Sequence, residues 1–421
     1  MDLKHTGVSE FLSWRHASGM LRDPLYRNSF FMAFTSVFNA GCGFFFWMIA
    51  ARLYTVEQVG LATALISALG LVVLLSRLGF DVSAIRFFPI EDRGRVVSTS
   101  LLVTTGACIL AGIAYLLSVH IFAPSMLFLR EPRFAVAFLL IGAASSAAAV
   151  TGNAFIADRR AEQYFMQNLL MALRIPALVP LVSLGVFGIF GCVGLAYVLA
   201  FLFGFAMLQR SFAMRPAVDM GFVSRSFRYS AWSYASSILS NAPTLVLPIM
   251  ILNILGEAEA AKYYVTFAIG NLVLIIPGSL GTSLFVEGSH GSSLKRGVYC
   301  AGAASLALLV PTVAVLVIMG DRLLGLLRGE YVEAFGLLRI VALSSFFVAA
   351  YSFFVPIQNV RMRVESVVRI NALRCVLMLL LSYILMQRYG IMGAGYAWMA
   401  TYVAVTIAAG WVAWREGWWR G

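Results

Sequence analysis

The chain has 421 residues, of which 61% are hydrophobic and 12% charged, and its formal net charge is +12 at pH 7. A soluble fold of this length cannot bury so much apolar surface, so the composition excludes a soluble globular protein and predicts an all-α integral membrane protein. The positive charge does not predict nucleic-acid binding, because no basic stripe is long enough and the aromatic residues lie in apolar runs rather than between lysines.

The first 27 residues carry Lys4, Arg15, Arg22 and Arg27. They contain no continuous apolar segment and no small-residue cleavage site, which argues against a cleaved signal peptide. We therefore expect residues 1–27 to form a cytoplasmic N-terminal segment.

Apolar runs between charged residues then predict about twelve transmembrane helices, since each run with its flanks is long enough to cross a hydrocarbon core of roughly 30 Å. The predicted spans are 28–52, 59–80, 96–123, 134–157, 163–186, 188–210, 229–255, 262–286, 297–320, 334–358, 366–387 and 391–414.

The distribution of Lys and Arg gives the orientation. Twenty lie in one set of loops and termini, eight in the opposite set and three inside spans. Because cytoplasmic loops carry the excess of positive charge, both termini are expected in the cytoplasm, with residues 415–421 as a short tail. The expected location is the cell (plasma or inner) membrane.

Short internal matches indicate that the chain was built twice. The clearest pairs the Gly-Ile-x-Gly that begins at Gly188 with the one that begins at Gly390, 202 residues later, and three looser matches have offsets near 200. An even number of spans per repeat predicts two parallel six-helix bundles, residues 28–217 and 218–414, an arrangement known among transporters.

Two arginines lie inside the spans that occupy the fifth place in each repeat. Arg174 and Arg374 are 200 residues apart and each follows Ala-Leu. An arginine at the centre of a membrane helix costs about 2.5–3.5 kcal/mol, so it needs a reason. Either the two only brace helices, or they face each other across one cavity and attract an anionic group.

Other polar residues are candidates for the same cavity. Arg77 and Asp81 are one helical turn apart and can pair, although snorkelling to headgroups also explains Arg77. Amide side chains inside spans are more often hydrogen-bonding links between helices than ligand contacts. The remaining candidates for substrate binding are Arg52, Asn39, Asn168, Asn241, Asn271 and Asn371.

Enzymatic motifs are missing from the sequence. It has no HExxH, no GxSxG and no phosphate-binding GxxxxGK, so an enzyme is not expected. No metal or organic cofactor is implied, and transport would draw on a Na⁺ or H⁺ gradient or on the gradient of the substrate itself. Carboxylates are scarce inside the spans whereas arginines are present, which favours an anionic substrate.

Several segments resemble a known family. The run from Ala50 to Tyr54, the run from Glu57 to Ala62 and Ser76-Arg77-Leu78-Gly79-Phe80-Asp81 are similar to the amino-terminal signature of polysaccharide biosynthesis proteins. These are the Wzx-like, O-antigen type flippases of lipid-linked oligosaccharides in the multidrug/oligosaccharidyl-lipid/polysaccharide (MOP) exporter superfamily. Arg328-Gly329-Glu330-Tyr331 also resembles the family's segment before its tenth helix.

The resemblance implies a MATE-like fold with a central V-shaped cavity between the two bundles. It also implies alternating access that moves an isoprenoid-diphosphate-linked oligosaccharide from the cytoplasmic to the external leaflet, as lipopolysaccharide and other surface glycans require. The implied partners are this lipid-linked sugar, membrane lipids, and glycosyltransferases or a polymerase of the same pathway. Guanidinium suits phosphate recognition, in agreement with the intramembrane arginines.

Three other functions stay open at this point. A MATE-type multidrug or cation antiporter would share the fold, but the scarcity of acids in the spans argues against it. A glycan polymerase or ligase would be expected to have a large external loop, and none is predicted. A membrane scaffold without transport activity would tolerate loss of the arginines.

Overall fold

The computed structural model describes residues 24–215, 217–289, 294–361 and 363–418. Almost all of them lie in helices, and these ranges contain no β-strand, so the predicted all-α class is confirmed. The expected cytoplasmic segment falls mostly outside the described residues, because the description starts at Pro24.

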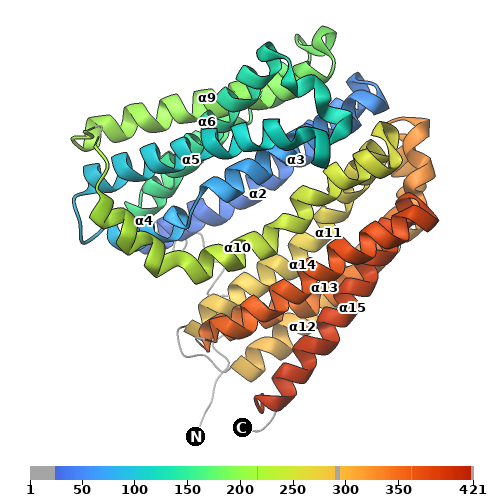
Figure 1. The fold of residues 1–421 in the computed structure, drawn as a ribbon. Helices are drawn as coiled ribbons and strands as arrows, with labels where there is room; N and C mark the ends of the chain where they lie inside the picture. The colour runs from blue at the N-terminus through green and yellow to red at the C-terminus, as the bar shows by residue number, and fades with distance from the viewer. Residues whose placement is uncertain (1–23, 216, 290–293, 362, 419–421) are drawn as a thin grey trace, which may run out of the picture.

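The first half of the chain forms one group of helices (Figure 1). They are α2 (Pro24–Leu53), α3 (Val56–Ser76), α4 (Phe80–Phe87), α5 (Arg93–Phe122), η1 (Pro124–Arg130), α6 (Pro132–Ala157), α7 (Ala161–Met171), α8 (Arg174–Ala177), η2 (Val182–Leu184) and α9 (Val186–Ser211).

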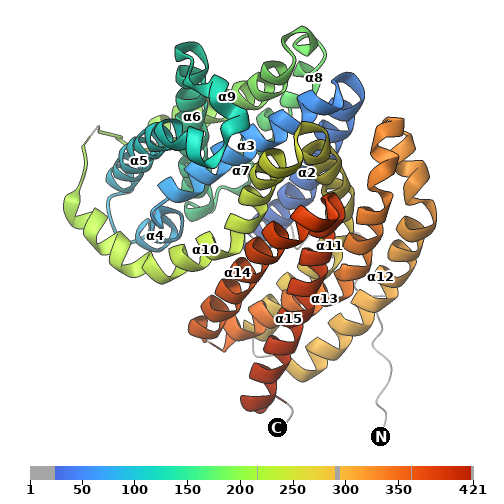
Figure 2. The same ribbon diagram turned by 45° about the vertical axis from the view of Figure 1, so that its right-hand side comes forward.

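The second half forms the other group. Its helices are α10 (Met220–Leu255), α11 (Glu257–Ser289), α12 (Leu294–Gly325), η3 (Gly329–Ala334), α13 (Phe335–Val360), α14 (Val364–Tyr389) and α15 (Ile391–Arg415). In Figures 1 and 2 the two groups converge where α3 and α11 begin and diverge toward the opposite face, which gives the expected V shape.

Eleven of the helices are long and apolar enough to span a membrane. They coincide with eleven of the twelve predicted spans, and the exception is 163–186. The structure divides this segment into α7, α8 and η2, so the prediction of a continuous fifth helix is wrong. Pro176 and Pro180 explain the break, because a proline has no N–H to donate and its ring clashes with the carbonyl one turn earlier.

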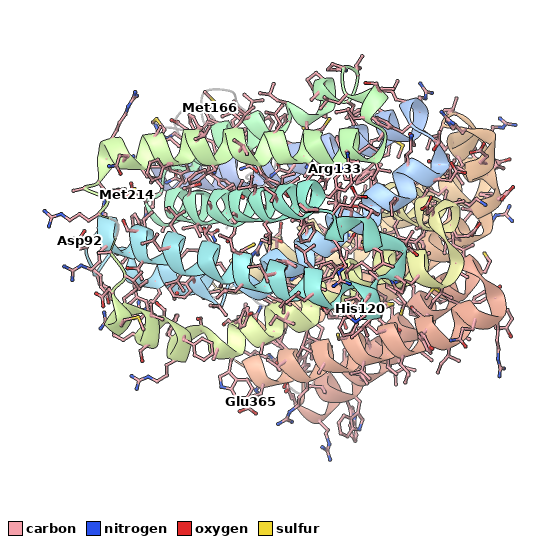
Figure 3. All side chains as sticks on the ribbon, turned by 45° about the horizontal axis from the view of Figure 1, so that its top comes forward. Asp92, His120, Arg133, Met166, Met214 and Glu365 are labelled. Atoms are coloured by element: carbon pink, nitrogen blue, oxygen red, sulfur yellow. The ribbon has the colours of Figure 1, made fainter. Side chains whose placement is uncertain are left out.

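Polar and charged side chains mark the helix ends. Asp92 caps α5 and His120 lies in its last turn, and Figure 3 places these two side chains toward opposite ends of that helix. Thr55 caps α3 through a reciprocal pair of hydrogen bonds with Gln58. Caps of this kind satisfy the backbone N–H groups that a helix start leaves unpaired.

The repeat is visible in the backbone, but in a different register from the sequence matches. Gly185 and Gly390 precede α9 and α15 with nearly the same dihedral angles, φ 56° with ψ −129° and φ 56° with ψ −140°. A Cβ at Gly188 would overlap the Leu181 carbonyl, and one at Gly393 would overlap the Leu385 carbonyl. Gly390 therefore corresponds to Gly185 rather than to Gly188.

Helices α7 and α14, at the fifth position of each half, also correspond in a different register from the one that the sequence spacing predicts. Arg160 precedes α7 with φ −103° and ψ 57°, and Arg363 precedes α14 with φ −101° and ψ 61°. In this register Asn168 corresponds to Asn371, whereas Arg174 and Arg374 do not correspond to each other. The spacing of 200 residues between the arginines is a coincidence of sequence.

Helix α10 links the two halves. It packs against α14, but it is also bonded to the first half. The Tyr234 hydroxyl donates to the Leu75 carbonyl at 2.6 Å, and Asn253 Nδ2 donates to the Phe122 carbonyl at 2.6 Å. Pro243 and Pro248 lie within this helix, where each removes a backbone hydrogen bond. The predicted boundary at 217/218 falls just before α10.

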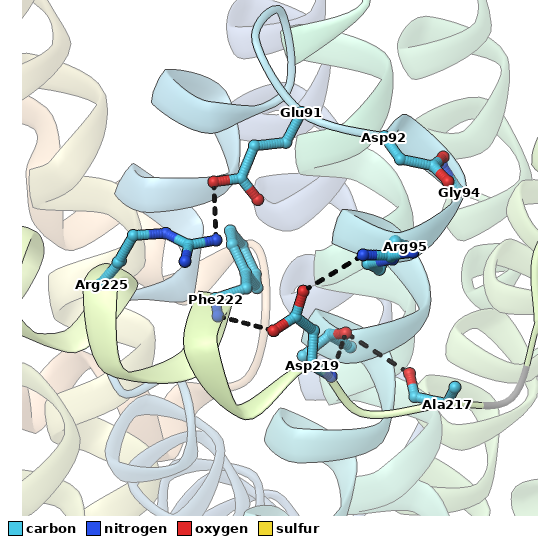
Figure 4. A network of polar contacts seen from close by, with 9 residues as sticks. Glu91, Asp92, Gly94, Arg95, Ala217, Asp219, Phe222 and Arg225 are labelled. Atoms are coloured by element: carbon cyan, nitrogen blue, oxygen red, sulfur yellow. Dashed lines mark hydrogen bonds and ion pairs between the residues drawn. The ribbon is translucent and has the colours of Figure 1, made fainter.

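The segment before α10 is held to the start of α5 (Figure 4). Arg225 pairs with Glu91 at 3.0 Å, and Arg95 lies 3.7 Å from Asp219. The Phe222 N–H donates to the Asp219 carboxylate at 3.0 Å. This hydrogen bond, with smaller contributions from Arg95 and Arg225, holds the pKa of Asp219 below its ordinary value.

Candidate substrate cavity

A cavity of about 450 Å³ lies between the two halves. Its lining comes from α2, α3, α8 and α9 of the first half and from α10, α11 and α15 of the second. Among the described residues no Asp or Glu lines it, and its charged side chain is Arg174. The space is therefore apolar with a local positive charge, at the place where a rocking motion of the halves would act.

Arg174 is the first residue of the four-residue helix α8. Its guanidinium lies 5.3 Å from the ring centroid of Phe46, and its Nε is buried without a hydrogen-bond partner among the described residues. A ring face offers some attraction to a cation. It does not replace the hydrogen bonds that five N–H donors can make, so Arg174 has unused donors next to the cavity.

The broken backbone places this side chain. Because the chain leaves α7 after Met171 and passes through turns around α8, Arg174 is not held within a continuous helix surrounded by neighbours on every side. The Tyr54 hydroxyl donates to the Leu178 carbonyl at 2.9 Å. This bond satisfies one of the carbonyls that the break leaves without a helical partner.

Three of the predicted amides lie at or behind the same cavity. Asn39 and Asn271 line it from opposite halves. Asn39 Nδ2 donates to Asn168 Oδ1 at 2.8 Å, and Asn168 Nδ2 donates to the Tyr164 carbonyl at 2.7 Å. Asn168 therefore links α2 to α7 and positions Asn39, while Asn271 offers its amide from α11.

Aromatic residues make up much of the remaining wall, and the sequence analysis did not select them. Trp47 and Tyr264 face each other from different halves with ring centroids 4.6 Å apart, and Tyr197, Tyr263 and Trp398 also line the space. Trp and Tyr concentrate at membrane interfaces. Trp47, Tyr263, Tyr264 and Trp398 lie within about two turns of helix ends, so the sequence does not distinguish them from ordinary interface residues.

Arg374 has different surroundings. It is 9% exposed, and its guanidinium donates to the Tyr402 hydroxyl at 3.2 Å and to the Ser240 carbonyl at 2.5 Å. The Tyr351 ring lies 4.7 Å away. These partners all belong to the second half, and Arg374 is not among the described residues that line the cavity. The expectation that the two arginines face each other across one cavity is wrong.

Asn371 takes part in the same network. It accepts a hydrogen bond from the Tyr351 hydroxyl at 2.6 Å and donates to Ser236 Oγ at 3.1 Å. The network joins α10, α13, α14 and α15, so Asn371 and Arg374 hold helices of the second half together. Arg374 Nε is buried without a partner in the described part of the chain, but both Nη atoms are bonded, and polar groups paired across helices in this way rigidify a core.

Arg77 and Asp81 form the expected pair at 3.9 Å. They are not on one continuous helix, because α3 ends at Ser76 and Leu78 and Gly79 turn the chain with φ of 49° and 80° before α4 begins. The pair borders a separate space of about 20 Å³ within the first half, together with Asn153. The volume is close to that of one water molecule.

The two remaining candidates lie away from the cavity. Asn241 is exposed and donates to the Ser237 carbonyl one turn earlier at 2.8 Å. Arg52 lies at the end of α2 and donates to the Leu326 carbonyl through Nε at 3.0 Å and Nη2 at 2.7 Å. No group of three or more His, Cys, Asp and Glu side chains that could hold a metal ion occurs in the part of the chain that the structure describes.

Solved structures with the same arrangement of helices are MOP-superfamily transporters. The lipid II flippase MurJ in an inward closed conformation has a TM-score of 0.71 at 12% identity, covering 90% of this chain and 86% of that one. An inward-facing multidrug resistance MATE transporter of the MOP superfamily has a TM-score of 0.66 at 12% identity, covering 88% and 92%. The VcmN MATE transporter of Vibrio cholerae reaches 0.56 at 17% identity, covering 95% and 97%.

The fold is thus that of the solved multi-pass transporters of the MOP type. The model of the polysaccharide biosynthesis protein family matches residues 25–285, and the chain belongs to that family. No curated protein gives a significant match to the sequence. The family and the structural neighbours are transporters and flippases rather than enzymes.

Proposed function

We propose that the protein is a flippase that moves an isoprenoid-diphosphate-linked oligosaccharide from the cytoplasmic to the external leaflet of the cell membrane by alternating access. The observation that carries this proposal is Arg174, a cation with unused donors in a cavity that lies between the halves. None of the described residues that line this cavity is acidic. Arginine binds phosphate oxygens through two parallel N–H donors. A diphosphate headgroup therefore matches the charge that the cavity offers.

The rest of the wall suits a sugar attached to that headgroup. Asn39 and Asn271 present amides that can donate to and accept from hydroxyl groups. Tyr and Trp combine an apolar ring face with a polar hydrogen, so they can pack on a sugar ring and bond its edge. With both termini in the cytoplasm, as the positive-inside rule predicts, the divergent face of the V opens to the side where the lipid-linked sugar is made.

A fluorescent lipid-linked sugar in vesicles that contain the purified protein tests this proposal. Wild-type protein is expected to make the label accessible to a membrane-impermeant quencher, and Arg174→Ala is expected to slow this by at least about tenfold, since one hydrogen bond to a charged group contributes about 1.5–3 kcal/mol. Flipping at the wild-type rate by folded Arg174→Ala would remove Arg174 from the mechanism. A lack of flipping by wild-type protein would contradict the function.

A multidrug or cation antiporter is the second candidate, and the aromatic wall favours it. Faces of Trp and Tyr attract organic cations, and MATE transporters share the fold. Arg174 opposes this function because a guanidinium repels a cation in a site of low dielectric. Expression of the protein in a drug-sensitive host distinguishes the two, because a flippase leaves drug susceptibility unchanged and an antiporter lowers it.

A further inference from the structure

Two tyrosines of the cavity wall have hydroxyl groups that the packing of the helices does not use. Tyr197 lies in α9 and Tyr264 in α11, so they come from different halves. The hydroxyls of Tyr54, Tyr234 and Tyr351 each donate to an oxygen of the protein, and no such bond from Tyr197 or Tyr264 occurs among the described residues. Neither oxygen is fully buried, so both hydroxyls can be reached from the cavity.

Tyr197 lies near the middle of its span. It follows Val186, the first residue of α9, by about 11 residues and so by roughly 16 Å. Anchoring at the membrane interface accounts for tyrosines near helix ends, but not for one at this depth. A hydroxyl removed from water costs free energy unless it forms a hydrogen bond. A polar ligand in the cavity gives the Tyr197 hydroxyl the partner that the protein does not supply.

Tyr264 offers its hydroxyl rather than its ring. The ring packs against Trp47 of the first half, with centroids 4.6 Å apart, so it already contributes to the contact between the halves. Arg174 and Tyr197 are close enough to act electrostatically on the Tyr264 hydroxyl. One cation and two hydroxyl donors therefore border the same part of the cavity.

We propose that the hydroxyls of Tyr197 and Tyr264 donate, together with Arg174, to the diphosphate oxygens of the substrate. This assignment rests on the proposed function. Hydrogen bonds to an ionised acceptor are shorter and stronger than those between neutral groups. Because Arg174 and Tyr197 belong to the first half and Tyr264 to the second, the bound headgroup would link the two halves across the cavity. The substrate would thereby stabilise the arrangement in which the halves close around it.

Replacement of each tyrosine by phenylalanine tests this assignment, because it keeps the ring and removes the hydroxyl. Binding of a radiolabelled lipid-linked sugar diphosphate and of its neutral, dephosphorylated form is measured with purified protein in lipid nanodiscs. Tyr197→Phe and Tyr264→Phe are each expected to bind the diphosphate at least about tenfold more weakly than wild-type protein does, because a hydrogen bond to an ionised group is lost. Binding of the neutral form should not change.

A matched control lies in the second half. Tyr383 is 52% exposed and is not among the described residues that line the cavity, so Tyr383→Phe should bind both ligands as wild-type protein does. In an Arg174→Ala background, Tyr197→Phe and Tyr264→Phe should have little further effect, because all three groups hold the same headgroup. A tyrosine that only packs would have the same effect in both backgrounds.

The link between the halves can be tested separately. A photoreactive phenylalanine analogue at position 197 or at position 264 should crosslink to the diphosphate ligand at saturating concentration, whereas the same analogue at position 383 should not. Positions 197 and 264 lie in different halves, so crosslinking at both shows that the headgroup contacts both. This measurement does not depend on the affinity of the phenylalanine variants.

Three results would overturn the assignment and leave the proposed function intact. They are wild-type affinity for the diphosphate in either phenylalanine variant, equal losses for the charged and the neutral ligand, and crosslinking at position 197 without crosslinking at 264. If wild-type protein bound the diphosphate no more tightly than the neutral form, the proposed function itself would be contradicted.

Discussion

The fifth position of each half is built from different backbone, although both helices start in the same way. α7 ends after Met171 and the chain turns through α8 and η2, whereas α14 runs without interruption from Val364 to Tyr389. The Nε of each arginine is buried without a partner among the described residues. Arg174 lies at the break beside a cavity, whereas Arg374 lies inside the intact helix with both Nη atoms bonded to its neighbours. The two arginines thus have different surroundings because they occupy non-equivalent positions, one at a break in the backbone and the other inside a continuous helix.

In the first half the arginine side chain is available to bind a ligand, whereas in the second half the arginine side chain stabilises the packing of helices. A broken helix exposes donors that a continuous helix would direct into its neighbours. A helix can break inside a membrane only where the freed backbone N–H and C=O groups find hydrogen-bond partners or line a cavity. Here the Tyr54 hydroxyl supplies one such partner, at the Leu178 carbonyl.

Moving the proline to the other half should have the largest effect. Leu379 in α14 corresponds to Pro176, and Leu379→Pro is expected to destabilise the protein by about 3 kcal/mol or more, because it removes a helix hydrogen bond and introduces a clash. Thermal denaturation of the purified variant measures this. Leu379→Ala controls for loss of the side chain. A melting temperature equal to that of this control would show that α14 tolerates a break as α7 does.

Replacing each arginine by alanine should affect stability differently in the two halves. Arg374→Ala is expected to lower stability by about 2–3 kcal/mol, because the Tyr402 and Ser240 groups lose a charged partner in a buried site. Arg174→Ala should change the melting temperature little, since the Arg174 guanidinium lies over the Phe46 ring beside the cavity, a contact that contributes less than hydrogen bonds to a charged group. Equal shifts in the two variants would contradict the distinction between a bracing arginine and a binding arginine.

The corresponding asparagines should differ in function more than in stability. Asn168→Ala and Asn371→Ala each remove hydrogen bonds that contribute about 1 kcal/mol. Asn168→Ala should also slow flipping, because Asn168 positions Asn39 at the cavity, whereas Asn371→Ala should leave the flipping rate per folded molecule unchanged. Slower flipping by Asn371→Ala, at an equal amount of folded protein, would place the second network in the transport mechanism.

The smallest effect concerns the connection between the halves. The pKa of Asp219 is held below its ordinary value by the Phe222 N–H and, more weakly, by Arg95 and Arg225. Ionised Asp219 therefore stabilises the start of α10 fully above its unfolded-state pKa. This stabilisation is lost as the pH falls through the lower folded-state pKa. Hydrogen exchange at the start of α10 should increase over that acidic range in wild-type protein. Asp219→Asn should show little change with pH there.

The sequence predicted the membrane class, eleven of the twelve spans and the division into two similar halves, because apolar length and charged punctuation are local signals. It also selected Arg174, Asn39 and Asn271, which the structure brings together at one cavity. It failed where packing decides the outcome. Pro176 and Pro180 lie where the fifth helix breaks, but Pro243 and Pro248 lie in the unbroken helix α10, so prolines alone do not show which helix breaks.

The register of the repeat could not be read from identical residues either. Gly188 and Gly390 match in sequence, but the backbone equivalents are Gly185 and Gly390, because each directly precedes its helix with a φ of 56°. The sequence spacing therefore suggested that Arg174 and Arg374 are equivalent positions of the two repeats, whereas the equivalent residues are Asn168 and Asn371. The aromatic wall could not be predicted because Trp47 and Tyr264 lie within about two turns of helix ends, where aromatic residues are common in membrane proteins.

The most direct test of the central claim is the preference of the cavity for a diphosphate. Binding of the lipid-linked sugar diphosphate and of its neutral, dephosphorylated form is measured for wild-type protein, Arg174→Ala and Arg374→Ala, each at equal folded concentration. We predict that wild-type protein and Arg374→Ala bind the diphosphate at least about tenfold more tightly than the neutral form, and that Arg174→Ala loses this preference. An undiminished preference in Arg174→Ala would contradict the account.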